Sequence, residues 1–205
     1  YLLISQPANN IATTSIYDAN GSLPGNSYVL MSVGQSVTVS ADLNFSTANG
    51  SFGFYFINRN SESTATSYLA LMNINQSSAN EQFRFATNAN ALSANGTASA
   101  GTLGTSTSVN AGITTGTFGN LSATYTILTA TTFRMSLSVG GVEQATQDFT
   151  GTPLSEVSFG FRANPIEGGT IQMDNFTLPD TIPEPSVALS AAIGILGLTF
   201  LRRRR

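Results

Sequence analysis

The chain has 205 residues, a formal net charge of −3 and only 9% charged residues, and it contains no lysine, histidine, cysteine or tryptophan. This composition excludes a Ser-His-Asp triad, a thiolate nucleophile and the usual zinc sites, and we expect no cofactor. Four arginines stand at the C-terminus, so the chain before them is acidic and lacks the basic surface that nucleic acid requires.

The first residues give no export signal. The segment 1–4 is apolar, but it is shorter than the core of a signal peptide and no basic residue precedes it. We therefore expect a processed or truncated start.

Residues 1–178 are predicted to form one all-β domain, an antiparallel two-sheet sandwich. Short runs alternate apolar and small polar residues, and clusters of Gly, Asn and Ser separate these runs. An alternation of period two is typical of strands with one face in the core and the other in water. It predicts these core residues: Val37, Val39, Ala41, Leu43, Phe45, Phe52, Phe54, Phe56, Phe83, Phe85, Phe133, Met135, Leu137, Val139, Val157, Phe159 and Phe161.

Three local features interrupt this regularity. Residues 88–116 are almost all small and polar, which predicts either a long surface excursion or two weak edge strands. Gly140 and Gly141 separate two strand-like runs by the length of a tight hairpin. Near Asp174 and Asn175 the apolar residues change parity, which predicts a β-bulge.

The body of the chain resembles the concanavalin A-like jelly-roll domains, including the laminin-G-like modules. The resemblance lies in the many aromatic alternating strands and in a last strand that reads Gln-Met-Asp-Asn-Phe-Thr-Leu over 172–178. Glycosidases on that fold carry neighbouring carboxylates on one strand. No Glu-x-Asp-x-x-Glu run occurs here, and Glu143 and Asp148, five residues apart, would lie on opposite faces of a regular strand. We therefore expect no catalytic residues and no enzymatic activity.

Two other kinds of site are open to such a sandwich. Tyr55 and Tyr68 are candidate glycan contacts, because exposed aromatic rings stack on sugars while nearby Asn and Arg supply hydrogen bonds. Asp174 is the one candidate ligand of a structural calcium, in company with turn carbonyls. We predict no other metal site.

The composition changes after residue 178. Residues 179–182 form a short linker, and Pro183, Glu184 and Pro185 follow it. The two prolines hold the backbone extended and present the glutamate to a processing enzyme. Residues 187–201 carry no charge and predict a short membrane helix, with a buried C-terminal helix as the alternative. The cluster Arg202, Arg203, Arg204 and Arg205 would hold the C-terminus in the cytoplasm.

This order of triplet, apolar run and arginine cluster over 183–205 resembles the PEP-CTERM sorting signal of Gram-negative bacteria. The resemblance implies recognition and tail removal by an exosortase, transient residence in the inner membrane with the body in the periplasm, and then a cell-surface or extracellular location. It also implies a link to extracellular polysaccharide and biofilm. The competing sortase motif at 178–182 lacks its glycine, where Ile182 stands.

The sequence thus predicts an exported surface protein that is processed by an exosortase. Its sandwich would be a non-catalytic matrix, adhesion or glycan-binding module. The alternative is a secreted carbohydrate-active enzyme on a concanavalin A-like fold.

Overall fold

The computed structural model describes residues 2–5, 12–15, 29–46, 50–58, 67–74, 81–89, 102–104, 106–165 and 169–178. These residues form two antiparallel β-sheets. The first sheet has six strands, in the spatial order β1 (Leu2–Ser5), β14 (Thr170–Thr177), β4 (Ser36–Phe45), β10 (Gly119–Thr129), β11 (Thr132–Val139) and β12 (Val142–Thr150).

The second sheet has eight strands. Six follow one another in the order β2 (Ala12–Ser15), β13 (Glu156–Pro165), β5 (Gly50–Asn58), β6 (Ser67–Ile74), β7 (Glu81–Ala89) and β8 (Thr102–Leu103). Two short strands complete the sheet: β3 (Val29–Leu30), which pairs with β13, and β9 (Thr107–Val109), which pairs with β7.

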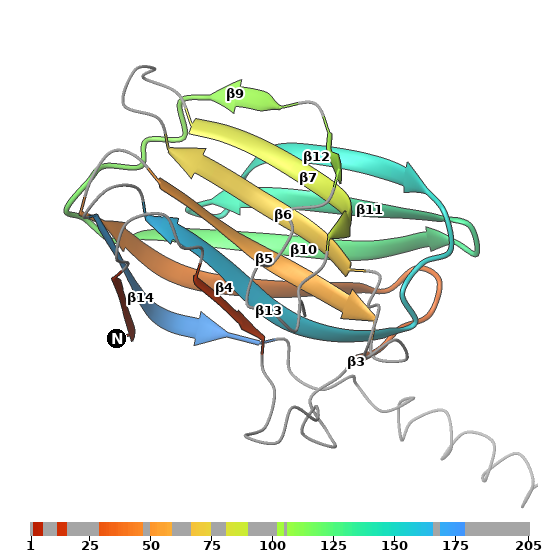
Figure 1. The fold of residues 1–205 in the computed structure, drawn as a ribbon. Helices are drawn as coiled ribbons and strands as arrows, with labels where there is room; N and C mark the ends of the chain where they lie inside the picture. Colours follow the sequence, from red (N-terminus) through yellow and green to blue (C-terminus); the bar gives the residue numbers. More distant parts are fainter. Residues whose placement is uncertain are drawn as a thin grey trace, which may run out of the picture.

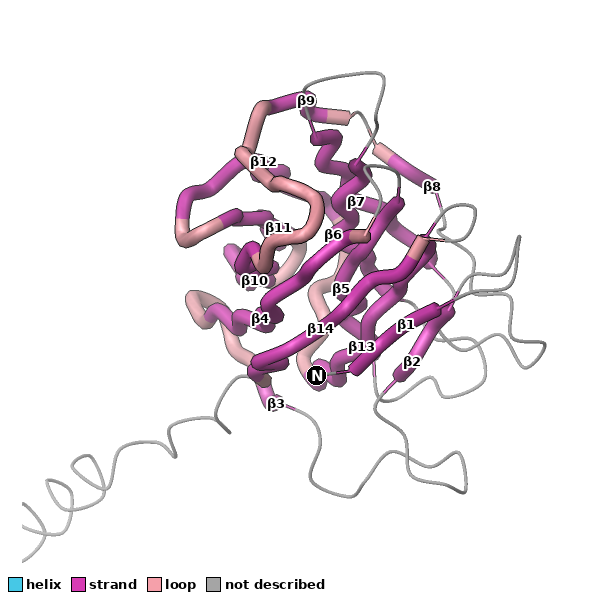
Figure 2. Tube along the Cα trace, turned by 90° about the vertical axis from the view of Figure 1, so that its left-hand side faces the viewer, coloured by secondary structure: helices cyan, strands magenta, loops and turns pink. Residues whose placement is uncertain are grey.

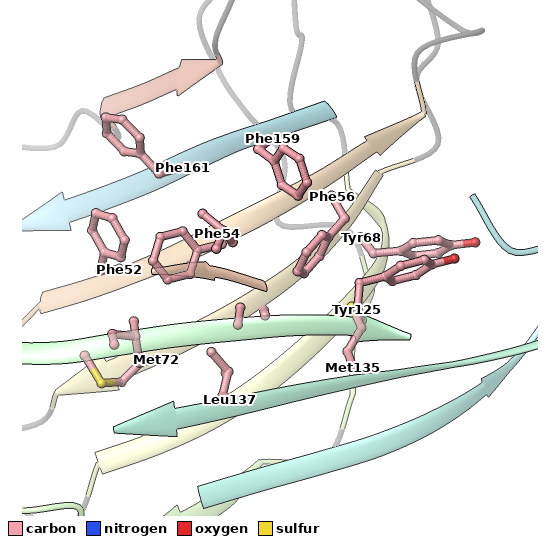
Figure 3. Packing of buried hydrophobic residues seen from close by; sticks show 14 of the residues in the cluster. Phe52, Phe54, Phe56, Tyr68, Met72, Tyr125, Met135, Leu137, Phe159 and Phe161 are labelled. Atoms are coloured by element: carbon pink, nitrogen blue, oxygen red, sulfur yellow. The ribbon is translucent and has the colours of Figure 1, made fainter. Parts of the chain in front are cut away.

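The sheets pack face to face, and the sandwich predicted from the sequence is confirmed. Figure 1 shows β13, β5, β6 and β7 in front of β4, β10, β11 and β12, and Figure 2 shows the two layers from the side. Every predicted core residue is buried in the central cluster or packs against it. Phenylalanine and tyrosine rings from both sheets meet between the layers (Figure 3). Tyr125, for example, lies 5.5 Å from Phe56 and 5.3 Å from Phe133, measured between ring centroids.

The local predictions also hold. Gly140 and Gly141 join β11 to β12 with φ of 58° and 80°, as a two-residue hairpin of this kind requires. The register of β14 against β4 shifts after Asp174, and Asn175 has a φ of 47°. In the described part of the region 88–116, β8 and β9 pair with β7 as short strands, in line with the alternative of weak edge strands; residues 90–101 lie outside the described residues.

One expectation is wrong. The sequence predicts a wet face on every strand, and β4 and β10 have one, because their outward side chains are exposed or half-buried. In β5, by contrast, both faces are buried from Gly50 to Ile57. Its neighbours β6 and β13 behave in the same way over most of their length.

Candidate functional site

The outer face of the first sheet is polar, and its side chains satisfy one another. Hydroxyl groups pair across β4 and β10, with 2.8 Å between the oxygens of Thr38 and Thr124 and the same distance between Ser36 and Thr126. Since these short side chains already have partners and also reach water, this surface offers few free groups to a ligand. We call the whole outer face of the first sheet the hydroxyl face.

The outer face of the second sheet is different. Its residues point away from the core and alternate with the phenylalanines of β5, β7 and β13. We call it the Tyr55 face; it comprises Ser51, Gly53, Tyr55, Ile57, Ser67, Leu69, Leu71, Asn73, Gln82, Arg84, Ala86, Ser158, Gly160 and Arg162. Five apolar members are buried yet lie outside the core cluster: Tyr55, Ile57, Leu69, Leu71 and Ala86.

Two arginines face each other across this surface. Strand register places Arg162 of β13 opposite Gly53 of β5, Gly53 opposite Leu71 of β6, and Leu71 opposite Arg84 of β7. The arginine backbones are therefore three strand spacings apart, about 14 Å. Because the four residues stand in one row, the guanidinium groups project from the two sides of the same strip of sheet.

Gly53 lets the centre of this row pack tightly. A Cβ atom at this position would lie 2.6 Å from the carbonyl oxygen of Ala70 and 2.9 Å from a methyl group of Leu69. No side chain fits there without a shift of the backbone, which explains why glycine occupies a position in the middle of a strand. Leu71 of β6 thus lies beside Gly53 in the row between the two arginines.

The neighbouring row carries the aromatic ring. Tyr55 stands opposite Gly160 on one side and Leu69 on the other. Burial raises the pKa of Tyr55 to about 12, while the positive charge of Arg162 acts in the opposite direction. Tyr55 therefore stays protonated at neutral pH and keeps its hydroxyl group as a hydrogen-bond donor.

Buried polar atoms without a hydrogen-bond partner concentrate on the same face. The described residues contain five such atoms, and only Asn44 Oδ1 lies on the first sheet. The other four belong to the Tyr55 face: Tyr55 Oη, Arg84 Nε, Ser158 Oγ and Arg162 Nε. Folded proteins rarely leave buried polar groups unsatisfied, so the concentration of such atoms makes this face the candidate site.

The charges follow the same division. On the hydroxyl face, Arg134 donates to both carboxylate oxygens of Asp148, at 2.6 and 3.0 Å. Arg84 donates to Gln82 Oε1 at 3.1 Å instead, and within the described part of the chain neither Arg84 nor Arg162 pairs with an acid. The carboxylate of Glu81, at the start of β7, is occupied elsewhere, because it accepts the backbone N–H groups of Ala111 and Ile113.

The structure corrects the reasoning behind the two candidate tyrosines. Tyr55 does lie on the face opposite the core, but it is fully buried, since both faces of β5 are covered. Tyr68 points into the core, where its ring lies 4.4 Å from that of Phe133 between centroids. Neither ring is an exposed stacking platform in this structure.

The sequence reasoning missed the arginines and leucines of the Tyr55 face. One signal was available: β6 begins Ser-Tyr-Leu-Ala-Leu-Met, an apolar run without alternation, and such runs are typical of strands buried on both faces. That Arg84 and Arg162 share a face depends on a register across four strands, which no local pattern reveals.

Glu143 and Asp148 are also placed differently from the expectation. A bulge in β12 pairs Glu143 with Ser138 and Asp148 with Arg134, so both carboxylates lie on the hydroxyl face rather than on opposite faces. Their partners are four residues apart on β11, about 13 Å. That separation exceeds the spacing of carboxylates in glycosidases.

Asp42 and Asp174 are directly opposite each other on β4 and β14, which the sequence did not suggest. Asp42 accepts hydrogen bonds from the side chains of Asn175 and Asn120, and these bonds lower its pKa. A general acid needs a raised pKa, so Asp42 is unsuited to that role. The described residues hold no group of three or more metal-binding side chains, and a calcium ion at Asp174 stays a prediction.

The sorting motif Pro183–Pro185, the apolar run 187–201 and the cluster Arg202–Arg205 lie outside the described residues. Within the described residues, no helix has the length and apolar character needed to span a membrane.

Comparison with family models and with curated proteins gave no match. Among solved structures, the chain is similar to the carbohydrate-binding module CBM66 from Bacillus subtilis, with 16% identity, 75% of this chain and 81% of that chain covered, and a TM-score of 0.42. A tetrameric galectin from the ball sponge Cinachyrella sp. is 12% identical, with 83% of this chain and 99% of that chain covered and a TM-score of 0.44. The alginate lyase Aly36B is 12% identical, with 87% of this chain and 80% of that chain covered and a TM-score of 0.48. Similarities at this level identify no family and assign no ligand.

Proposed function

We propose that the sandwich is a non-catalytic glycan-binding module and that the Tyr55 face holds the ligand. The concentration of unsatisfied buried polar atoms on this face, beside Tyr55 and two arginines without acidic partners in the described part of the chain, carries the proposal. Sugar-binding sites rely on a few oriented polar groups, and this face has Asn73, Gln82 and Arg84 among its partly accessible side chains.

A ligand would meet the half-buried part of the face first. Asn73, Gln82 and Arg84 are partly accessible on β6 and β7, whereas Tyr55 and Arg162 are buried. The ligand would therefore contact these accessible residues.

Several observations argue against the alternative, a carbohydrate-active enzyme. The chain has no histidine, Glu81 is occupied by backbone N–H groups, and Asp42 has a lowered rather than a raised pKa. Tyr55, with a pKa of about 12, is a poor general base at neutral pH.

A glycan array probed with the full chain in mild detergent tests the binding role. We expect binding to at least one class of polysaccharide, with loss of binding in Arg84→Gln and full binding in Arg134→Gln, whose arginine belongs to the hydroxyl face. Binding that survives Arg84→Gln unchanged would place the site elsewhere. Release of reducing sugar, abolished by replacing one carboxylate, would show that the protein is an enzyme.

We propose further that an exosortase sorts this protein to the cell surface or the medium through residues 183–205. The resemblance of Pro183, Glu184, Pro185, the apolar run and Arg202–Arg205 to a PEP-CTERM signal supports this route. The body would then reside in the periplasm while the tail is in the inner membrane, and afterwards contact extracellular polysaccharide.

Replacing the Pro-Glu-Pro triplet by alanines separates recognition from anchoring. The apolar run and the arginines remain, so we expect export and membrane insertion without cleavage, and the uncut protein should accumulate in the inner membrane. Immunoblots of membrane and medium fractions follow the loss of the tail by size. Normal processing of this variant in a host that carries an exosortase would contradict the assignment.

A further inference from the structure

We infer that the loop between β9 and β10 holds a second carbohydrate contact, in which the ring of Phe118 stacks on a sugar of a neutral polysaccharide. The inference goes beyond the proposed function, because this loop lies at the end of the sandwich and not on the Tyr55 face. It requires no part of the chain to move, since Phe118 is already 50% exposed.

The loop, residues 110–118, crosses from the second sheet to the first. It follows β9, which pairs with β7, and it leads into β10, which pairs with β4 and β11. In Figure 1 it is the green trace at the left of the molecule, and Figure 2, seen from that side, shows it in pink. Phe118 comes directly before the first residue of β10, so its backbone is continuous with a central strand of the first sheet.

Hydrogen bonds hold this loop to both sheets. Glu81, at the start of β7 and only 6% exposed, accepts the backbone N–H groups of Ala111 and Ile113 at 2.7 and 3.2 Å. The N–H of Gly116 donates to the carbonyl oxygen of Phe45, at the end of β4, at 3.0 Å. Because the loop is ordered before any ligand arrives, binding would not bear the entropic cost of ordering it.

The apolar side chains around the loop divide into two groups. Val109, Ala111 and Ile113 are half-buried and pack against the core. Phe118 faces solvent instead, and it is the one aromatic residue among the large exposed hydrophobic residues of the described part of the chain. An exposed ring on a fixed backbone offers a platform for the C–H face of a sugar.

The neighbours of Phe118 supply polar groups for sugar hydroxyls. Thr114, Thr115 and Thr117 are exposed on the same loop. The hydroxyl group of Thr117 donates to the carbonyl oxygen of Thr114 at 2.9 Å, and its own oxygen can still accept a hydrogen bond. The loop thus combines one aromatic ring with a few oriented hydroxyl groups, as sugar-binding sites do.

The charges near the loop favour a neutral ligand. Residues 107–121 contain no charged side chain, so no arginine is present there to bind an acidic sugar. Asn120, two residues after Phe118, donates to Asp42 at 2.9 Å. Hydrogen bonds from Asn175 and Asn120 lower the pKa of Asp42 and keep it charged at neutral pH. This negative charge would repel an acidic polymer.

A protein partner fits the same surface less well. Specific protein interfaces bury about 800 Å² on each partner around an apolar centre. Among the described residues, the other large exposed hydrophobic residue at this end of the first sheet is Val142, which is 62% exposed and stands in one row with Val139 and Leu121. One ring and one valine among threonines and glycines suit a single sugar better than a protein surface.

A tryptophan placed at the loop tests the contact directly. The chain contains no tryptophan, so the variant Phe118→Trp carries its only indole at the proposed site. Titration of the full chain in mild detergent with laminarin, dextran and galactomannan, which are neutral polymers, should shift the indole emission with at least one of them. Val142→Trp, at the same end of the sheet, is the matched control, and its emission should stay unchanged.

Affinity electrophoresis in gels that contain the same polymers measures the weight of the ring. Phe118→Ala should raise the dissociation constant roughly tenfold, as the loss of a stacked aromatic ring implies, whereas Phe118→Tyr should bind like the parent. Val142→Ala removes an exposed apolar side chain without a ring and should also bind like the parent. A thermal melt shows that the variants are folded.

The outcomes separate this inference from the proposed function. Parent-like binding by Phe118→Ala, or an unchanged emission of Phe118→Trp at saturating polymer, would overturn the inference and leave the Tyr55 face as the site. Self-association that is lost in Phe118→Ala, measured by sedimentation without polymer, would overturn it as well, because the ring would then contact a second copy of the chain. Failure of the parent to bind any polysaccharide of the gels and of a glycan array would overturn the proposed function together with the inference.

Discussion

The two outer faces of the sandwich differ in how their polar side chains find hydrogen-bond partners. The hydroxyl face uses short side chains that bond to each other, as Thr38 does with Thr124, and its one described ion pair is complete. The Tyr55 face has large apolar residues and arginines, and four of its buried polar atoms lack partners. The two faces of one sandwich thus differ in how completely their polar groups are satisfied within the described part of the chain.

The largest expected effect separates the faces by stability. Leu69→Ala should lower the free energy of unfolding by about 2–5 kcal/mol, because the fully buried side chain leaves a cavity. Thr124→Ala on the hydroxyl face should cost about 1 kcal/mol or less, since it removes one half-buried hydroxyl pair. Urea unfolding measures both. Similar losses in the two variants would mean that the Tyr55 face is not buried as described.

A pair of glycines gives the next comparison. Gly53→Ala should cost about 1–3 kcal/mol, because the new methyl group would lie 2.6 Å from the carbonyl oxygen of Ala70. Gly119 lies at the start of β10 in the first sheet, and a methyl group added there would meet nothing within 4 Å. Gly119→Ala is therefore the matched control and should be close to neutral. Thermal melts of the two variants should diverge, and equal melting temperatures would contradict the tight packing at Gly53.

Two tyrosine hydroxyls sharpen the comparison further. The hydroxyl oxygen of Tyr125, in the core, accepts the backbone N–H of Leu154 at 2.7 Å, so Tyr125→Phe should cost about 1–3 kcal/mol by leaving a buried donor unsatisfied. Tyr55→Phe removes a hydroxyl group without a partner among the described residues and should leave stability unchanged or raise it slightly. A large loss in Tyr55→Phe would show that the hydroxyl has a partner in solution.

The smallest effect is a dependence on alkaline pH. The pKa of Tyr55 is raised from 10.0 to about 12 in the folded protein, so the folded state holds its proton more tightly than the unfolded state. The stabilisation is complete below pH 10 and is lost as the pH rises toward 12. At pH 11 the contribution of Tyr55 amounts to about 1 kcal/mol. Tyr55→Phe should flatten the decline between pH 10 and 12 in urea titrations, and an unchanged slope would contradict the raised pKa.

The sequence predicts the fold because its information is local. Alternation in 36–45, the Gly140-Gly141 pair and the parity change near Asp174 each report on a few consecutive residues, and each is confirmed. The candidate site is not local. Arg84 and Arg162 are 78 positions apart in the chain, and only the register of β7, β6, β5 and β13 places them on the same face. Tyr55 is buried because both faces of β5 are covered. Parity predicts which way a side chain points, but it does not predict what lies above it.

The place of β14 has a consequence for the timing of folding. This strand comes last among the described strands, yet it lies between β1 and β4, which are among the first (Figure 2). In a chain that is made or translocated from its N-terminus, β1 can find no neighbour in its sheet until residues 170–177 have arrived. Such late long-range pairing slows folding and keeps the first sheet incomplete until almost the whole domain is available.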